Sequence, residues 1–156
     1  MPSKKIKLPS LSTYKNLMGK FPICCVDVVF LNQAKDQTLL FKRDNEPVKN
    51  TFFTLGGALQ KGEIFIQGAV RKIKEETSLT IPANRLTFAG VTNDLHNNSR
   101  FPKISYHAAV IFYYCTITPA EEKKIKLDEQ HKEKKWFLTN DKKIHPLIKD
   151  RLKLIL

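Results

Sequence analysis

The residues with the clearest chemical potential in this sequence follow a pair of glycines. Gly56 and Gly57 precede a charged segment that contains Arg71, Glu75 and Glu76. Paired glycines let the backbone turn tightly and approach a ligand closely. Carboxylates are hard oxygen ligands that suit Mg²⁺ or Mn²⁺, and Mg²⁺ commonly bridges carboxylates to the phosphates of a substrate. This segment therefore predicts a divalent-metal site for a phosphate-containing ligand.

Residues 63–77, which carry these charges, have the spacing of a helix. Four apolar residues recur at i, i+3, i+4 and i+7, namely Ile66, Ala69, Val70 and Ile73. Arg71 and Glu75 lie off this apolar face as an i, i+4 pair. The plain alternative is an amphipathic surface helix with Glu–Arg pairs. A glycine turn before a helix offers backbone groups to a metal or a phosphate, which favours a binding site.

Residues 56–79 resemble the Nudix box, whose pattern is G-x5-E-x7-R-E-U-x-E-E-x-G-U with U an aliphatic residue. The positions that match in register are Gly57, Glu63, Arg71, Ile73, Glu75, Glu76 and Leu79. Many fixed positions in one register are far more specific than a single glycine-rich turn. The resemblance implies a Nudix hydrolase with an α+β fold, a mixed β-sheet between helices. It also implies metal-dependent hydrolysis of a nucleoside diphosphate linked to another group, with Mg²⁺ or Mn²⁺ as the cofactor.

Two positions depart from the box. Lys72 stands where the box has its first helical Glu, and Ser78 stands where it has Gly. In most family members that Glu binds the metal or handles the proton of the attacking water. A charged lysine does neither, and one turn before Glu76 it competes with a cation. The departure implies that activity is lost or that another residue activates the water.

Residues 127–138, LDEQHKEKKWFL, resemble the matching segment of GDP-mannose mannosyl hydrolases, a Nudix branch that also lacks the first helical Glu. The likeness extends to other segments, including VDVVF, LLFKR and GGALQKGE. In that branch the carbonyl of the first glycine, one helical Glu and a Gln hold a metal, and the next His is the general base. The matching positions are Gly56, Glu76 and Gln130 for the metal and His131 for the base.

The mannosyl hydrolases direct water to the anomeric carbon of the sugar and expel GDP. The resemblance implies that Arg43 and Arg71 assist the leaving phosphate and that Asp27 contacts the substrate. A neutral imidazole is a suitable base for water at neutral pH. Contact residues of the branch are replaced at three positions, Ala58, Asp94 and Ala108. We therefore expect a GDP-mannose-like nucleotide sugar, with the base and the sugar left open.

Two other functions stay open. Because Glu75 is retained, one is ordinary Nudix chemistry, in which water attacks phosphorus and Glu75 and Glu76 bind metal. The other is an inactive nucleotide- or RNA-binding module, which the net charge of +12 would suit. On the residues alone, His131 in its polar KEKK surroundings is better explained as a solvated histidine. Asp27, within an apolar strand, indicates a functional or strongly hydrogen-bonded carboxylate.

The composition is that of one folded domain. The 156 residues are 42% apolar and 27% charged, which fits a single domain over 1–156. Cys24, Cys25 and Cys115 suggest neither a disulfide framework nor a zinc site. The sequence has no signal-peptide core and no apolar run near the roughly 20 residues of a membrane span. We expect a cytoplasmic protein whose partner is a small nucleotide substrate rather than a membrane, and a homodimer is left open.

The elements that must position these residues follow from hydrophobic periodicity. Strands are expected at 23–31, 38–43, 51–55, 86–92, 104–117 and 134–138. Helices are expected at 10–20 and 140–156, the second interrupted near Pro146. The strand at 104–117 is almost continuously apolar, as expected of a central strand buried on both faces. Strands around one mid-sequence helix, with helices at both ends, predict an α/β/α layered domain.

Overall fold

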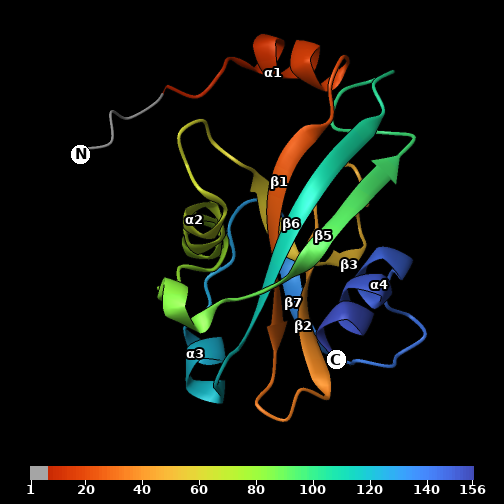
Figure 1. The fold of residues 1–156 in the computed structure, drawn as a ribbon. Coiled ribbons are helices and arrows are strands. Elements are labelled where there is room, and N and C mark those ends of the chain that lie inside the picture. The colour runs from red at the N-terminus through yellow and green to blue at the C-terminus, as the bar shows by residue number, and fades with distance from the viewer. Residues whose placement is uncertain (1–6) are drawn as a thin grey trace.

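A mixed seven-stranded sheet with helices on both of its faces forms the protein (Figure 1). The computed structural model describes residues 7–156. The strands are β1 (Ile23–Leu31), β2 (Gln37–Arg43), β3 (Phe52–Phe53), β4 (Leu55–Ala58), β5 (Thr87–His96), β6 (Tyr106–Thr116) and β7 (His131–Leu138). The helices are α1 (Leu11–Met18), α2 (Phe65–Thr77), α3 (Pro119–Lys124) and α4 (Pro146–Ile155), with a 3₁₀ turn, η1, at Ala83–Arg85.

β1 holds the sheet together because it pairs along both of its edges. It runs parallel to β6 over its whole length. Its other edge pairs antiparallel with β2 at one end and with β4 at the other. The path through the sheet is β3-β2-β1-β6-β5, with β7 paired to β2. The pairing with β4 places Gly56 directly opposite Asp27.

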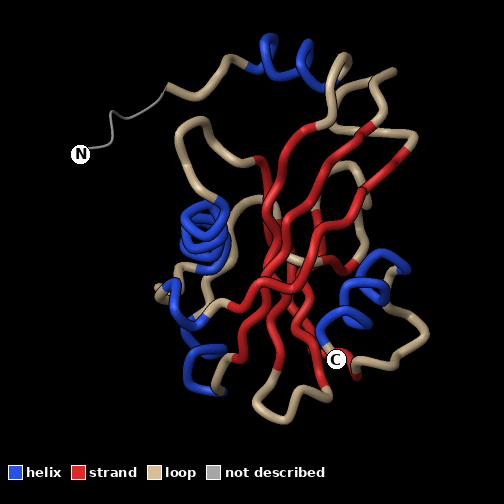
Figure 2. Tube along the Cα trace, in the orientation of Figure 1, coloured by secondary structure: helices blue, strands red, loops and turns tan. Residues whose placement is uncertain are grey.

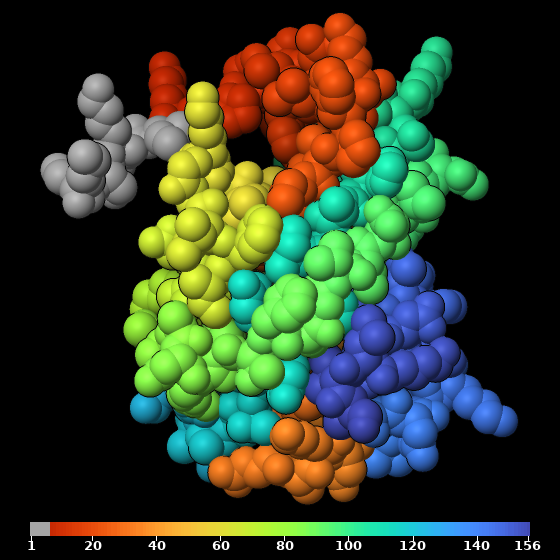
Figure 3. Space-filling model, viewed as in Figure 1, coloured from red at the N-terminus to blue at the C-terminus, as the bar shows by residue number. Residues whose placement is uncertain are grey.

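Successive side chains of β1 enter two different cores, because neighbours on a strand point to opposite faces. Val26 and Val28 join the core under α2, where Ile73 is also fully buried. Cys25 and Val29 join the core on the other face. α4 packs against β5 on that second face, and in Figure 3 the blue atoms of the C-terminal part lie beside green atoms. The sheet is therefore covered on both sides, and the predicted layering is confirmed (Figure 2).

Several elements begin or end at residues other than those predicted. The predicted strand 51–55 divides at Thr54, and its second part continues through both glycines as β4. β5 extends four residues beyond 92, to His96, and β7 begins three residues before 134, at His131. α4 begins only at Pro146, because proline suits the first position of a helix, where its missing N–H is not needed. Within residues 7–156, no helix is long and apolar enough to cross a membrane.

Candidate active site

The glycines of β4 form a thin wall between two groups of charged side chains. On the α2 side, the backbone N–H of Gly56 donates to Glu76 Oε2 at 3.1 Å. On the opposite side, a Cβ at Gly56 would lie only 2.0 Å from Asp27 Oδ1. Only glycine allows β4 to approach the Asp27 carboxylate this closely. Gly56 therefore contacts one carboxylate on each face of the sheet.

Arg71 joins α2 to the loop that precedes it. Its Nε donates to Glu63 Oε1 at 2.6 Å, and Nη2 donates to Glu63 Oε2 at 2.9 Å and to the Ala58 carbonyl at 3.1 Å. Nη1 donates to both carboxylate oxygens of Glu75. The Arg71 guanidinium holds the pKa of Glu63 below its usual value. Arg71 thus holds the loop before α2 in place through Glu63 and the Ala58 carbonyl. Its contact with a substrate phosphate stays a prediction.

Lys72 places its ammonium against the two box carboxylates. Nζ lies 2.7 Å from Glu76 Oε1 and 3.3 Å from Glu75 Oε2. The 2.7 Å contact is an ion pair outside hydrogen-bond geometry, so Glu76 Oε1 lacks a directed donor among residues 7–156. Burial raises the pKa of Glu76 to about 7 against the opposing effect of Lys72. Lys72 therefore occupies the position beside Glu76 from which it would compete with another cation.

The Lys72 side chain keeps its positive charge although it is only 12% exposed. Burial lowers the pKa of Lys72, but the carboxylates of Glu76 and Glu75 outweigh that effect and leave the pKa raised. A lysine with a raised pKa is protonated at neutral pH. This end of α2 therefore carries a positive charge beside Glu76 at neutral pH.

The predicted metal ligands are brought together only in part. Gly56 and Glu76 are in contact. Gln130 is exposed, and among residues 7–156 no hydrogen bond joins its side-chain amide to either of them; its backbone N–H donates to Asp128 Oδ1. The same residues contain no cluster of three or more His, Cys, Asp or Glu side chains suited to a metal. With the Lys72 ammonium at Glu76, this arrangement does not fit a divalent ion bound to Glu76.

His131 is buried, with 6% of its surface exposed, at the first residue of β7. Its Nδ1 lies 2.7 Å from Asp128 Oδ1, and its Nε2 lies 3.9 Å from Glu76 Oε2. The ring packs edge-on against Phe41. The interpretation of His131 as a solvated histidine in a polar turn is wrong, because the strand begins earlier than expected and carries the ring into the core.

The charge and tautomer of His131 follow from its surroundings. Burial lowers its pKa more than the Asp128 carboxylate raises it, so the imidazole is neutral near pH 7. A carboxylate only accepts hydrogen bonds, so Nδ1 is assigned the proton and donates it to Asp128. Nε2 then carries a lone pair and faces Glu76. This is the arrangement that a general base requires.

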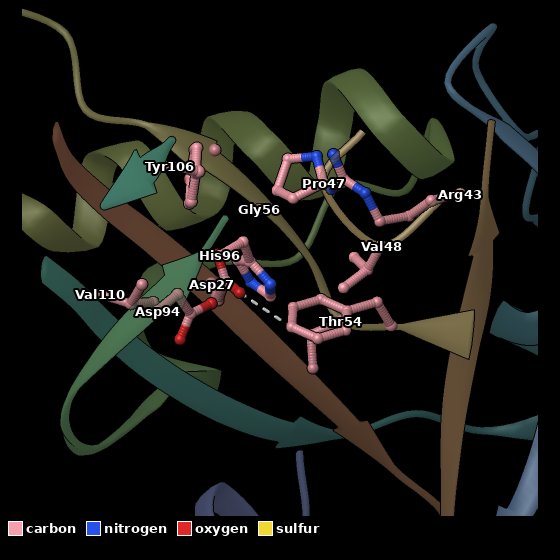
Figure 4. A pocket seen from close by; sticks show the side chains of 12 residues that line it. Asp27, Arg43, Pro47, Val48, Thr54, Gly56, Asp94, His96, Tyr106 and Val110 are labelled. Atoms are coloured by element: carbon pink, nitrogen blue, oxygen red, sulfur yellow. Dashed lines mark hydrogen bonds between the residues drawn. The ribbon is translucent and has the colours of Figure 1, made fainter. Parts of the chain in front are cut away.

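A small cavity of about 40 Å³ lies on the other face of the glycine wall. Figure 4 shows Asp27, Asp94 and His96 pointing toward one another from β1 and β5. Arg151 of α4 is fully buried beneath them, with Nη1 2.7 Å from Asp27 Oδ2 and Nη2 2.8 Å from Asp94 Oδ2. Thr54 also donates to Asp27 at 2.9 Å. Asp27 is thus strongly hydrogen-bonded, which is one of the two roles expected for it, and its predicted contact with the substrate stays a prediction.

Arg43 lines the same cavity and leaves one polar atom unsatisfied. Its Nη2 donates to Asn45 at 3.0 Å, whereas its buried Nε has no hydrogen-bond partner among residues 7–156. A buried, unpaired guanidinium nitrogen is costly unless a ligand completes it. This supports the predicted role of Arg43 in binding substrate.

Two residues of these networks were missed in the sequence. Arg151 follows Ile148 by three residues and adjoins Leu152, so a charge falls on the apolar face of the last helix. A charge on a buried face needs a buried partner, and Asp27 was the available one. Asp128 lies three residues before His131, a spacing that lets a side chain bond across one turn.

Known proteins share the fold of this chain. MutT NUDIX hydrolase from Burkholderia pseudomallei superposes with a TM-score of 0.67 at 18% identity, covering 88% of this chain and 100% of that one. An Ap4A hydrolase from C. elegans superposes with a TM-score of 0.61 at 17% identity, covering 85% and 94%. At these identities the likeness shows the fold.

A known protein is similar in sequence to about half of this chain. The ADP-ribose pyrophosphatase of Methanocaldococcus jannaschii is 38% identical over 78 residues, which are 49% of this chain and 44% of that relative. The match thus spans less than half of the relative's length. The family model described as NUDIX domain matches residues 24–155, from β1 to the end of α4. With its box in register on β4 and α2, the chain belongs to the NUDIX domain family.

Proposed function

We propose that this protein hydrolyses a GDP-mannose-like nucleotide sugar, a nucleoside diphosphate linked to a sugar, by directing water to the anomeric carbon. The observation that carries the proposal is the line of side chains Asp128–His131–Glu76. It supplies a neutral imidazole with an oriented lone pair beside the box carboxylate. The fold and the box support hydrolysis of a nucleoside diphosphate derivative in general, and His131 supports the attack at carbon.

The reaction follows from groups of the chain itself. Nε2 of His131 takes a proton from water as the water oxygen forms a bond to the anomeric carbon. The bond between that carbon and the phosphate oxygen breaks, and the nucleoside diphosphate leaves with the electron pair. Arg43 and Lys72 lie on either side of the glycine wall, yet both are close enough to His131 for their charges to lower its pKa. Their positive charges neutralise the charge that develops on the leaving diphosphate. His131 then returns its proton to solvent.

Nudix hydrolases generally use a divalent metal such as Mg²⁺. When bound, such an ion neutralises phosphate charge and polarises phosphoryl oxygens. The carboxylates of the box are present here, but the Lys72 ammonium stands against both. The proposed reaction therefore uses only the protein's own side chains.

Attack at phosphorus is the second candidate, and two observations favour it. The relative that matches half of this chain is an ADP-ribose pyrophosphatase. Glu75 keeps a side chain that is 46% exposed and accessible to water. In this alternative Glu75 accepts the proton, and the product oxygen from water is on phosphate.

Hydrolysis in ¹⁸O-labelled water distinguishes the two routes. A panel of nucleotide sugars, ADP-ribose and dinucleoside polyphosphates would be incubated with the protein, and both products of each would be weighed by mass spectrometry. We expect the label on the sugar. Label on a phosphate product would establish the second candidate. Binding of these compounds without turnover of any would indicate a nucleotide-binding module instead.

A further inference from the structure

We infer that Lys72 is a built-in cation, which excludes a divalent metal from Glu75 and Glu76 and itself binds the diphosphate of the substrate. The first part concerns the free protein and is independent of the reaction. The second part rests on the proposed function, because it takes a nucleoside diphosphate group as the ligand.

The position of the ammonium supports the exclusion. Lys72 Nζ lies 2.7 Å from Glu76 Oε1, within the distance at which an ion pair is formed, and Glu76 is only 1% exposed. A metal bound to that oxygen would lie within a few ångströms of Nζ. Two cations at such a separation repel strongly in a buried site. The lysine and a divalent ion thus compete for the same carboxylate oxygen.

The backbone beside Lys72 leaves room for this side chain. A Cβ at Gly57 would lie 3.0 Å from Lys72 Cε and 3.3 Å from Nζ. The box glycine, which has no Cβ, therefore lets the lysine lie flat against β4. The side chain is held by β4 on one side and by its own helix on the other, so the ammonium stays at the carboxylates.

Donors of the ammonium remain for a ligand. An ammonium group has three N–H donors, of which one donates to Glu75 Oε2, while the contact with Glu76 is an ion pair outside hydrogen-bond geometry. The Lys72 side chain is 12% exposed, so part of it faces solvent. Lysine binds phosphate as a point charge in other phosphate sites. A free donor is thus suited to a phosphate oxygen, the ligand that a metal would otherwise hold.

Binding of Mn²⁺ to the substrate-free protein tests the exclusion. The variant Lys72→Glu restores the box residue and replaces the competing cation with a carboxylate. Electron paramagnetic resonance of free Mn²⁺ should show that this variant binds Mn²⁺ at least about 100-fold more tightly than the wild type. Lys20→Glu, an exposed lysine beyond α1, gives the same change of net charge and should bind as the wild type does. Equal Mn²⁺ affinity in the wild type and Lys72→Glu overturns the exclusion.

Two further variants keep this test interpretable. Lys72→Met removes the ammonium without adding a charge, and it should gain about 10-fold in Mn²⁺ affinity even if the glutamate variant fails to fold. Adding Glu76→Gln to Lys72→Met should abolish that gain, because the ligand oxygen is replaced by an amide. A gain that persists in the double variant would place the metal elsewhere and overturn the assignment of Glu76.

Titration of the wild type with GDP in excess EDTA tests the second part. By calorimetry we expect Lys72→Met to weaken GDP binding about 10-fold, and Lys20→Met to leave it unchanged. Unchanged GDP affinity in Lys72→Met overturns the phosphate role and leaves the exclusion standing. None of these measurements involves hydrolysis. Label on phosphate in the ¹⁸O experiment would thus reject attack at carbon without altering these results.

Discussion

At the scale of single residues, the catalytic claim depends on His131 being neutral and correctly oriented. An imidazole accepts a proton only in its neutral form. The rate of hydrolysis should therefore rise with pH through the pKa that His131 has in the folded protein. Burial lowers that pKa below its usual value of 6.5. The acid limb of the rate profile should consequently lie below pH 6.5. His131→Gln should lower kcat by about 100-fold or more with little change in KM. Normal turnover in that variant would remove His131 from the mechanism.

Asp128 gives a second measurement at the same scale. Its carboxylate raises the pKa of His131 and fixes the proton on Nδ1. Asp128→Asn should therefore move the acid limb of kcat to lower pH and lower the maximal rate by about 10-fold or more. A merely structural role would lower the rate without moving the limb. Exposed Glu129→Gln, at the next position, is the matched control and should do neither.

Ser78 is the second departure from the box, and its cost is conformational. It ends α2 in the left-handed region with a φ of 63°, and its N–H donates to the Lys74 carbonyl. Glycine adopts this conformation without the penalty that a Cβ imposes. Ser78→Gly should stabilise the protein by about 1 kcal/mol. Urea unfolding at neutral pH measures the gain, and a loss of stability would show that the serine side chain has a role of its own.

At the scale of elements, α3 was missed in the sequence because its signals are local and short. Thr118 and Glu121 form a capping box around six residues, which is too few for a periodic apolar face. Glu121 also pairs with Arg85 of η1, so one side chain starts a helix and links two elements. Caps of this kind resemble ordinary polar loops in a sequence. The long periodic segments, β1, β6 and α2, could be predicted because many residues repeat one pattern.

The same contrast explains which parts of the site were predictable. Box residues lie in one segment, so their register alone predicts that Gly56 and Glu76 lie together. Arg151 meets Asp27 across 124 positions of sequence, and no local pattern specifies that contact. The early start of β7 was missed because every residue of HKEKK is polar, so the segment lacks the alternation of apolar and polar residues that predicts a strand. Its strand conformation comes from pairing with β2, which is a tertiary effect.

The Arg85–Glu121 pair makes a prediction about acid stability. The pair and its cap lower the pKa of Glu121 to about 2 from 4.5. A depressed carboxyl pKa contributes stability that is complete above pH 4.5 and is lost as pH falls toward 2. Because both side chains are partly exposed to solvent, we expect this contribution to be about 1 kcal/mol. Glu121→Gln keeps a capping side chain, so the difference in unfolding free energy from the wild type should shrink between pH 6 and pH 3. If the difference in unfolding free energy is the same at pH 6 and pH 3, the Arg85–Glu121 pair does not contribute to stability in this way.

At the scale of the whole molecule, charge is distributed unevenly between surface and interior. The chain carries a net charge of +12, and its pI is near 9.7. Such a surface attracts nucleotide phosphates and also RNA, with a strong dependence on salt. Salt-sensitive binding would therefore follow from either an enzyme or a binding module. The interior network of Arg151 is different, because it is shielded from salt and ties α4 to two strands.

Arg151 should consequently be one of the residues on which folding depends most. Its guanidinium pairs with Asp27 and Asp94 and also lies over the ring of Phe53, 5.4 Å from its centroid. Arg151→Met would leave two buried carboxylates uncompensated. We expect a loss of about 3–5 kcal/mol at neutral pH, measured by urea unfolding. Lys153→Met, an exposed residue of the same helix, should change stability by less than about 0.5 kcal/mol.

Two measurements show whether that loss comes from charge rather than packing. Burial already raises the pKa of Asp27, and without Arg151 it should rise further. Protonation then relieves the uncompensated charge, so the deficit of Arg151→Met should shrink as pH falls from 7.5 toward 5. Asp27→Asn and Asp94→Asn combined with Arg151→Met remove all three charges and should recover part of the loss. If the triple variant is less stable than Arg151→Met, or the deficit is the same at both pH values, α4 is held by packing and the buried charges are secondary.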